Sequence, residues 1–204
     1  MTKQEITWWT GQNGKDYTDS NPVDPLTRVS EFKKLIGDLP IKRILEIGCN
    51  RGHNLTAISS VGNYELHGID PCEYAITKAR EANHKAVFLV ADAFRIPYPD
   101  SYFDLVLTSG VLMHISNDDL SQAVGEIYRV RSEFILTIEY GMDPYQPPGI
   151  RHNEVWDVAL RINNVEFLVY RNYGNVFHGY VADGPTGKEW GNEKMHWWLF
   201  RNSK

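Results

Sequence analysis

The stretch Arg43-Ile-Leu-Glu-Ile-Gly48-Cys-Asn-Arg-Gly52-His-Asn-Leu55 decides the fold of this chain. It consists of a short apolar strand that ends in glycine, a turn with a second glycine, and the start of a helix. Glycines at the end of a buried strand let the backbone approach a ligand without a Cβ clash, and the following helix N-terminus offers free N–H groups. The stretch therefore predicts a strand–turn–helix unit that binds a ligand.

Strand and helix patterns alternate on both sides of this unit. Strands are predicted at residues 43–48, 66–70, 86–90, 103–108 and 134–138, and helices at 26–39, 53–61, 74–83 and 118–130. The strands are apolar throughout, which is typical of a parallel sheet buried on both faces. A helix at 153–162 and two β-rich runs at 165–170 and 195–201 follow, and the two runs predict a final antiparallel hairpin.

These patterns predict an α/β fold with a Rossmann-like, doubly wound sheet that is mostly parallel and ends in an antiparallel C-terminal hairpin. We expect a single domain over residues 26–204. Residues 1–25 have poor periodicity, many turn residues and three large aromatic side chains, Trp8, Trp9 and Tyr17. They predict an arm that folds over another part of the molecule and contains a short helical turn.

Composition excludes several classes of protein. The 204 residues are 42% hydrophobic and 23% charged, which excludes disordered and fibrous chains. The net charge of −5 argues against binding nucleic acid through phosphate neutralisation, and no apolar run approaches the roughly 20 residues that cross a bilayer. The N-terminus does not resemble a signal peptide. Cys49 and Cys72 lack the spacing of a zinc site or a disulfide framework, so we expect a cytoplasmic protein.

The first turn distinguishes two kinds of nucleotide-like ligand. A dinucleotide site requires G-x-G-x-x-G, whereas here Asn50 and His53 stand in the second and third glycine positions. The order acidic-x-Gly-x-x-x-Gly, formed by Glu46, Gly48 and Gly52, instead resembles motif I of the class I S-adenosylmethionine-dependent methyltransferases. In that family the turn passes under the methionyl group of the cofactor, and the acidic residue sits near it. The resemblance implies S-adenosyl-L-methionine as cofactor and S-adenosyl-L-homocysteine as product.

Three further segments resemble this family at the ends of later strands. Asp70 closes the second strand, where the family binds the ribose hydroxyls, and Asp92 follows the third, where the family binds adenine. Residues 100–115 resemble motif IV and its following loop. The cofactor-binding residues implied by the resemblance and the arm are Trp9, Tyr17, Glu46, Gly48, Cys49, Asn50, Gly52, Asp70, Pro71, Asp92, Ala93, Ser109 and Gly110.

The N-terminal string from Trp8 to Asn21 narrows the resemblance. It is similar to the aromatic-Trp-x-Gly-x-x-Gly-x-x-Tyr opening of small methylases associated with pseudaminic acid and related surface-sugar gene clusters. The similarity covers about the first 140 residues and departs at Ser20, where a basic residue is expected. It implies an amino sugar or nucleotide-linked sugar as acceptor. The arm aromatics are then interpreted as a lid over the sulfonium; the alternative is a hydrophobic staple on the core.

Candidate catalytic and acceptor-binding residues follow the last strands. His114 comes just after the fourth strand, Glu139 and Tyr140 follow the fifth, and Arg151 and His152 follow a Pro/Gly loop. We expect all five to contact the acceptor and consider His114, His152 and Glu139, in that order, as the general base. For His114 the alternative is a satisfied core histidine, and for the loop pair a solvated surface. No Asp/Glu/His grouping resembles an oxygen-rich metal site, so no metal is expected.

The sequence thus predicts an S-adenosylmethionine-dependent methyltransferase (EC 2.1.1.-) that methylates nitrogen or oxygen of a small polar molecule. One alternative is a catalytically silent cofactor-binding scaffold of the same fold. Another is a methyltransferase acting on a natural product or a macromolecule. The acidic charge and the string Thr108-Ser-Gly-Val, in place of D/N-P-P-Y/F, count against a macromolecular acceptor. The oligomeric state is left open.

Overall fold

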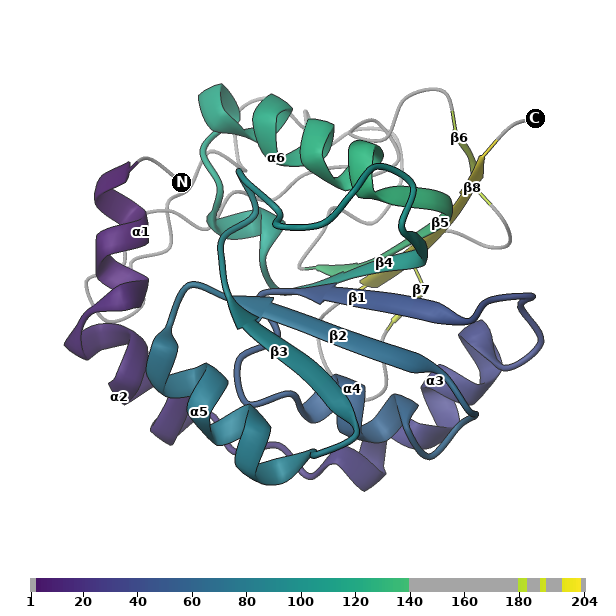
Figure 1. Cartoon of the computed structure of the whole chain (residues 1–204), viewed down its shortest axis with the longest axis horizontal. Helices are drawn as coiled ribbons and strands as arrows, with labels where there is room; N and C mark the ends of the chain where they lie inside the picture. The colour runs from purple at the N-terminus through teal and green to yellow at the C-terminus, as the bar shows by residue number, and fades with distance from the viewer. Residues whose placement is uncertain (1–2, 140–179, 183–187, 190–195, 203–204) are drawn as a thin grey trace, which may run out of the picture.

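The chain forms one mixed sheet covered by helices on both faces (Figure 1). A computed structural model describes residues 3–139, 180–182, 188–189 and 196–202. Its elements are α1 (Lys3–Thr10), α2 (Gln12–Ser20), η1 (Pro25–Arg28), α3 (Val29–Ile36), β1 (Arg43–Ile47), α4 (His53–Ile58), β2 (Glu65–Asp70), α5 (Glu73–Ala82), β3 (Ala86–Val90), β4 (Phe103–Ser109), η2 (Leu112–His114), α6 (Asn117–Val130), β5 (Arg131–Glu139), β6 (Tyr180–Ala182), β7 (Lys188–Glu189) and β8 (His196–Asn202). No helix among these residues combines the length and apolar character needed to cross a bilayer.

The strand order is β3-β2-β1-β4-β5-β8-β6, with β7 also paired to β8. Strands β1 to β5 are parallel, while β8 runs antiparallel to β5, β6 and β7. The predicted doubly wound, mostly parallel sheet with antiparallel C-terminal strands is therefore confirmed. From β1 the sheet continues through β2 to β3 on one side and through β4 to β5 on the other, so the strand order reverses between β1 and β4. In open α/β sheets, ligands bind at the carboxyl ends of the strands beside such a reversal.

Each face of the sheet has its own apolar core, which explains why the central strands are apolar throughout. Ile44 and Leu105 belong to one core together with residues of α3, α4 and α5. Leu45 and Val106 belong to the other core, together with residues of α6. Side chains alternate across a strand, so neighbouring residues of β1 serve opposite cores.

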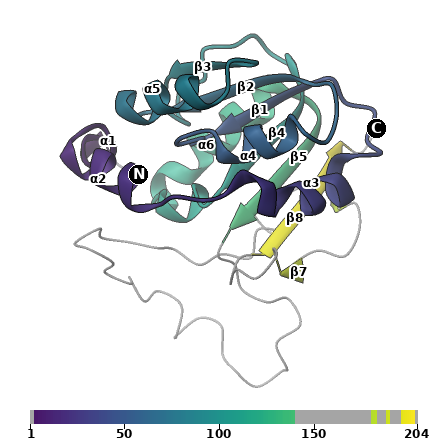
Figure 2. The same cartoon turned by 90° about the horizontal axis from the view of Figure 1, so that it is seen from below.

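The N-terminal arm is more helical than its sequence indicates. Residues 3–20 form two helices broken at Gly11, whereas the sequence predicts only a short helical turn. Gly14 is buried within α2, where a Cβ would collide with the carbonyl of Trp9, so a glycine permits the two helices to pack closely. The two helices lie at the end of the sheet where β1 and β2 terminate (Figures 1 and 2).

Two predicted helices differ in extent from the observed ones. The helix expected at 26–39 divides into η1 and α3, and α3 ends at Ile36. Asp24 caps the start of η1 through the N–H of Leu26, and Pro25 occupies its first position. Helix α4 ends at Ile58, three residues before the predicted end. The helix expected at 153–162 and the β-rich run at 165–170 lie outside the described residues.

Strand β3 forms one edge of the sheet, and an arginine covers part of it. Ala91 donates its N–H to the carbonyl of Asp70, so by alternation the carbonyl of Phe88 faces away from β2. The guanidinium of Arg80, from α5, donates to this carbonyl at 2.6 Å. Val87 and Val90 remain exposed on the same strand.

The connection between β3 and β4 contains no helix among its residues 91–102 and is held by Arg129 of α6. The guanidinium donates to the carbonyls of Tyr98 at 2.7 Å and Ile96 at 2.8 Å. It also pairs with Asp100 at 3.0 Å and with Glu126 at 2.7 Å. One side chain thus fixes three points of the connection to α6.

We predict that Arg129→Met destabilises the folded chain by about 2–3 kcal/mol, because it leaves two carbonyls and two carboxylates without their charged donor. Hydrogen exchange should accelerate over residues 95–101 more than over the strands. Lys34→Met is the control, since it removes only an exposed pair with Glu31, which contributes at most about 0.5 kcal/mol. Equal effects of both substitutions on the melting temperature would contradict this account.

Candidate active site

The register of three strands brings the predicted motifs to one rim. Ile47 of β1 is aligned with Ile69 of β2 and with Thr108 of β4. The residues that follow these three, Gly48, Asp70 and Ser109, therefore meet at the carboxyl ends of the strands.

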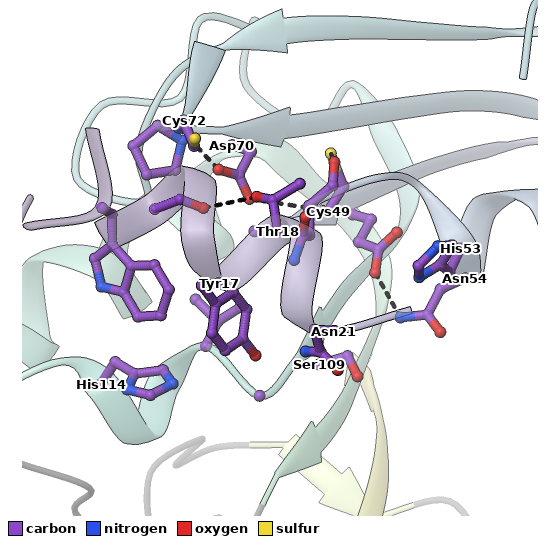
Figure 3. A pocket seen from close by; sticks show the side chains of 18 of the residues that line it. Tyr17, Thr18, Asn21, Cys49, His53, Asn54, Asp70, Cys72, Ser109 and His114 are labelled. Atoms are coloured by element: carbon purple, nitrogen blue, oxygen red, sulfur yellow. Dashed lines mark hydrogen bonds between the residues drawn. The ribbon is translucent and has the colours of Figure 1, made fainter. Parts of the chain in front are cut away.

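A cavity of about 450 Å³ opens at this rim, within the range of small-molecule sites (Figure 3). Its lining includes eleven residues predicted from the sequence: Trp9, Tyr17, Glu46, Gly48, Cys49, Asn50, Asp70, Pro71, Ser109, Gly110 and His114. The sequence analysis missed ten others: Gly14, Thr18, Asn21, Val23, Arg28, His53, Asn54, Cys72, Val111 and Met113. Five of the missed residues precede β1 and reach the rim only through tertiary packing, and the other five lie within a few residues of the predicted turns after β1, β2 and β4.

The turn after β1 requires unusual backbone conformations. Gly48 has a φ of 68°, and a Cβ there would collide with the side chain of Val111. Asn50 has a φ of 46°, a region that asparagine tolerates better than most residues. The N–H of Asn50 donates to Asp70 Oδ2 at 2.9 Å, and the N–H of Cys72 donates to Asp70 Oδ1 at 2.8 Å. Asp70 therefore holds the two turns together while facing the cavity.

Two carboxyl groups in the cavity resist ionisation. Burial raises the pKa of Asp70 to about 6, although the two N–H donors favour its charged form. Burial raises the pKa of Glu46 to about 8, against the lowering effects of its hydrogen bond to Asn54 and of the nearby Arg28 charge. Oε2 of Glu46 is buried and has no hydrogen-bond partner among the described residues.

Aromatic rings form another side of the cavity. The ring of Trp9 lies 5.1 Å from that of Tyr17 and 5.0 Å from that of His114, both edge to face. Nδ1 of His114 is buried without a hydrogen-bond partner among the described residues. Burial lowers the pKa of His114 to about 4, so its imidazole is neutral at pH 7. His114 and Asn54 lie on opposite sides of the cavity (Figure 3).

Glu139 does not reach the cavity, contrary to its predicted place beside the acceptor. It is fully buried, and its carboxylate accepts the backbone N–H groups of Val111 and Leu112 at 3.1 Å and of Met113 at 3.4 Å. These contacts anchor the turn that carries His114. Glu139 therefore supports the cavity wall from behind, and we withdraw it as a candidate base.

Three predicted cofactor contacts also fall outside the cavity lining. Gly52 faces inward, where a Cβ would lie 2.9 Å from the ring of Phe88, so this glycine permits close packing of the turn on β3. Asp92 Oδ1 accepts the N–H groups of Phe94 and Arg95 and forms a local turn. Ala93 is buried in the core beside α6. Tyr140, Arg151 and His152 lie outside the described residues.

Arg28 and Asn54 are the most informative of the missed residues. Nη1 of Arg28 donates to Asn54 Oδ1 at 2.6 Å, and Asn54 Nδ2 donates to Glu46 Oε1 at 2.6 Å. The only sequence signal is a polar residue on the buried side of the helix after the glycine turn. Within the described residues, no three His, Cys, Asp or Glu side chains gather closely enough to hold a metal ion.

Residues 45–133 match a family model described as a methyltransferase domain. The matched segment runs from β1 to the start of β5 and so includes both the glycine turn and the turn that carries His114. The domain match supports S-adenosylmethionine as the cofactor.

Similar proteins include cycloartenol-C-24-methyltransferase of Arabidopsis thaliana, 29% identical over 129 residues, which are 59% of this chain and 38% of the relative. 27-O-demethylrifamycin SV methyltransferase of Amycolatopsis mediterranei is 33% identical over 98 residues, 44% of this chain and 35% of the relative. The chain spans less than half the length of these curated relatives.

Among solved structures, magnesium protoporphyrin IX methyltransferase from Synechocystis with bound S-adenosylhomocysteine has a TM-score of 0.67 at 12% identity, over 98% of this chain and 100% of the other. This similarity concerns the fold. The fold described above is that of the class I methyltransferases.

We predict that Glu139 makes the folded chain less stable as the pH rises from about 4.5 to 7. Burial raises the pKa of Glu139 from 4.5 to about 7, so over this interval the folded chain binds the proton more tightly than the unfolded chain. The lost stabilisation is on the order of 3 kcal/mol and is complete above pH 7. Glu139→Gln cannot ionise, so the melting temperature of the wild type minus that of the variant should fall between pH 5 and 8.

Glu126→Gln is the matched control, because the paired Arg129 lowers the pKa of Glu126. Its difference from wild type should stay flat over the same range. A flat difference for Glu139→Gln as well would show that ionisation of Glu139 has no cost in the folded chain.

Proposed function

We propose that this chain transfers a methyl group from S-adenosyl-L-methionine to nitrogen or oxygen of a small polar molecule. The observation that carries the proposal is the cavity beside β1 and β4, most of whose lining residues belong to the segment that matches a methyltransferase domain. The polar side chains of Glu46, Asn50 and Asp70 line one part of this cavity and suit the ribose and amino-acid groups of the cofactor. The neutral His114, with the ring of Trp9 beside it, lines another part.

The polar atoms of the cavity fit this cofactor. Glu46 Oε2, Asn50 Oδ1 and His114 Nδ1 are buried without hydrogen-bond partners among the described residues, and all three residues line the cavity. A buried polar atom without a partner costs about 1–3 kcal/mol, so a ligand that supplies the missing partners gains this energy. Under the proposal, Asp70 accepts hydrogen bonds from ribose hydroxyls, and Glu46 lies at the methionyl end.

The bound cofactor supplies a methyl group that its sulfonium has already activated. The residues of the chain then need to orient an acceptor and exclude water, and orientation of this kind contributes about 7–11 kcal/mol in favourable cases. Trp9 and Tyr17 form an apolar wall at the rim, which supports the interpretation of α1 and α2 as a lid. Their ring faces attract a positive charge and keep water away from it.

His114 is our candidate for the general base. Its neutral imidazole offers Nδ1 to a hydrogen on the acceptor, and Glu139 fixes the turn on which it stands. A hydroxyl acceptor gives its proton to this atom as the methyl bond forms, whereas an unprotonated amine needs only to be held there.

The resemblance of residues 8–21 to the opening of surface-sugar methylases favours an amino sugar or nucleotide-linked sugar as acceptor. The net charge of −5 argues against a nucleic acid as acceptor. The alternative is a scaffold that binds the cofactor without catalysis, which the same cavity would also serve.

The proposal predicts heat of binding with S-adenosylhomocysteine and none with NAD in titration calorimetry. With cofactor labelled in the methyl group, label should pass to small molecules of a metabolite extract. His114→Gln should lower this transfer at least about 100-fold, the low end for loss of a general base, while the affinity for S-adenosylhomocysteine changes little. Binding without transfer to any acceptor would favour the scaffold, and absence of binding would refute both functions.

We predict that binding of S-adenosylhomocysteine releases a proton between pH 6.5 and 8. Glu46 has a pKa of about 8 in the free chain, and an ammonium group placed beside it favours the charged carboxylate. Besides burial, the charge of Arg28, which lowers the pKa, and that of Asp70, which raises it, set the starting value of this carboxyl group. The affinity should therefore rise with pH over this range. Calorimetry in two buffers of different ionisation enthalpy measures the release, which Glu46→Gln should abolish.

A further inference from the structure

The carboxyl group of Glu139 accepts three consecutive backbone N–H groups, which belong to Val111, Leu112 and Met113. Oε1 accepts the first two and Oε2 accepts the third. These residues form the turn that ends at His114. An ionised carboxylate accepts at both oxygens, whereas a protonated carboxyl group carries a hydrogen on one of them and has less capacity to accept. The three bonds are therefore made best by the charged form of Glu139.

Two buried hydroxyl groups allow Glu139 to take up a proton. Thr108 hydrogen bonds to the carboxyl group of Glu139, and its Oγ1 lies 2.7 Å from Oγ1 of Thr137, where either atom can be the donor. Both threonines are fully buried. When Glu139 is charged, Thr137 donates to Thr108, which donates to the carboxylate. When Glu139 is protonated, both hydroxyl groups can rotate and the order of donors reverses. The pair therefore offers an acceptor for the hydrogen of a protonated Glu139.

Glu139 titrates where its neighbour on the turn does not. Burial raises the pKa of Glu139 to about 7, whereas burial lowers the pKa of His114 to about 4. The other titratable residue on a neighbouring element is His196 of β8, whose backbone is in register with Glu139. Between pH 6 and 8 the imidazole of His114 therefore stays neutral while the carboxyl group that holds its turn changes charge.

We propose that Glu139 is a positioning residue that makes the placement of His114 depend on pH. The charged carboxylate holds residues 111–113 and so keeps the imidazole of His114 at the cavity wall, and uptake of a proton by Glu139 loosens this turn. This inference rests on the proposed function, because it concerns the conditions under which the candidate base can act. Methyl transfer then becomes faster as Glu139 loses its proton.

Nuclear magnetic resonance of the full chain tests this coupling without an acceptor. In the wild type, the amide signals of residues 111–113 should titrate together with a midpoint near pH 7. The rings of Trp9 and His114 lie 5.0 Å apart, and the nuclear Overhauser contacts between them should weaken from pH 8 to pH 6. Glu139→Gln should show neither change over this range. A merely structural role for Glu139 would leave the contacts between the two rings unchanged in the wild type.

Thr108→Val moves the midpoint while the carboxyl group stays in place. The hydrogen bond from Thr108 favours the charged form of Glu139, so its loss should raise the midpoint by about one pH unit. Valine is close to threonine in size, and Thr108 does not line the cavity. This variant keeps the test decisive if Glu139→Gln does not fold, and melting temperatures show which variants are folded.

Methyl transfer to a metabolite extract is the second readout. At saturating cofactor, which removes the effects of Glu46 and Asp70 on binding, the wild-type rate should rise about tenfold from pH 6 to 8. This is the change in the charged fraction of a group with a pKa of about 7. Glu139→Gln should remove this rise.

Glu126→Gln is the matched control for both readouts. Glu126 also accepts a backbone N–H, that of Ile96 at 2.8 Å, but it does not line the cavity. Its replacement should leave the midpoint and the pH profile of transfer as in the wild type.

The proposal is overturned if the contacts between Trp9 and His114 stay constant from pH 6 to 8, or if Glu139→Gln keeps the wild-type pH profile. An unchanged midpoint in Thr108→Val also overturns it, because the titrating group would then not be Glu139. If the wild type transfers no label at any pH, the proposed function fails. The resonance titration then still decides whether Glu139 sets the position of His114.

Discussion

The parallel alignment of β1 with both β2 and β4 is the constraint on which the site depends. Because Ile47 is in register with Ile69 and Thr108, three strands end at the same height, and the turns that follow them share one cavity. Asp70 then joins two of these turns through the N–H groups of Asn50 and Cys72. A slip of one residue in any pairing would turn its side chains to the opposite face of the sheet.

The sequence predicted what is encoded locally. The strand ends at Gly48, Asp70 and Ser109 follow from apolar runs bounded by turn residues, and each reached the cavity. The direction in which a side chain leaves a strand end was harder to predict. Glu139 is the last residue of β5, one position beyond the predicted strand, and its carboxylate accepts three N–H groups of a neighbouring turn instead of facing the cavity.

Contacts between residues that are distant in the chain could not be predicted, because they leave no local pattern in the sequence. Arg28 and Asn54 are 26 positions apart and meet only because η1 packs on α4. The arm is a similar case, because its helices are short and polar and draw their stability from packing against each other and α5. Periodicity is a weak signal for segments of eight or nine residues, so the sequence indicated an arm without its helices.

The contact of Arg80 with the edge of β3 affects the association of these molecules with one another in concentrated solution. A strand edge with exposed valines is a template for sheet growth between molecules. A strand arriving at this edge would first have to displace a charged group from the carbonyl of Phe88 and desolvate it. Arg80 therefore disfavours β-polymerisation between molecules through β3, the edge of the sheet opposite to the antiparallel strands.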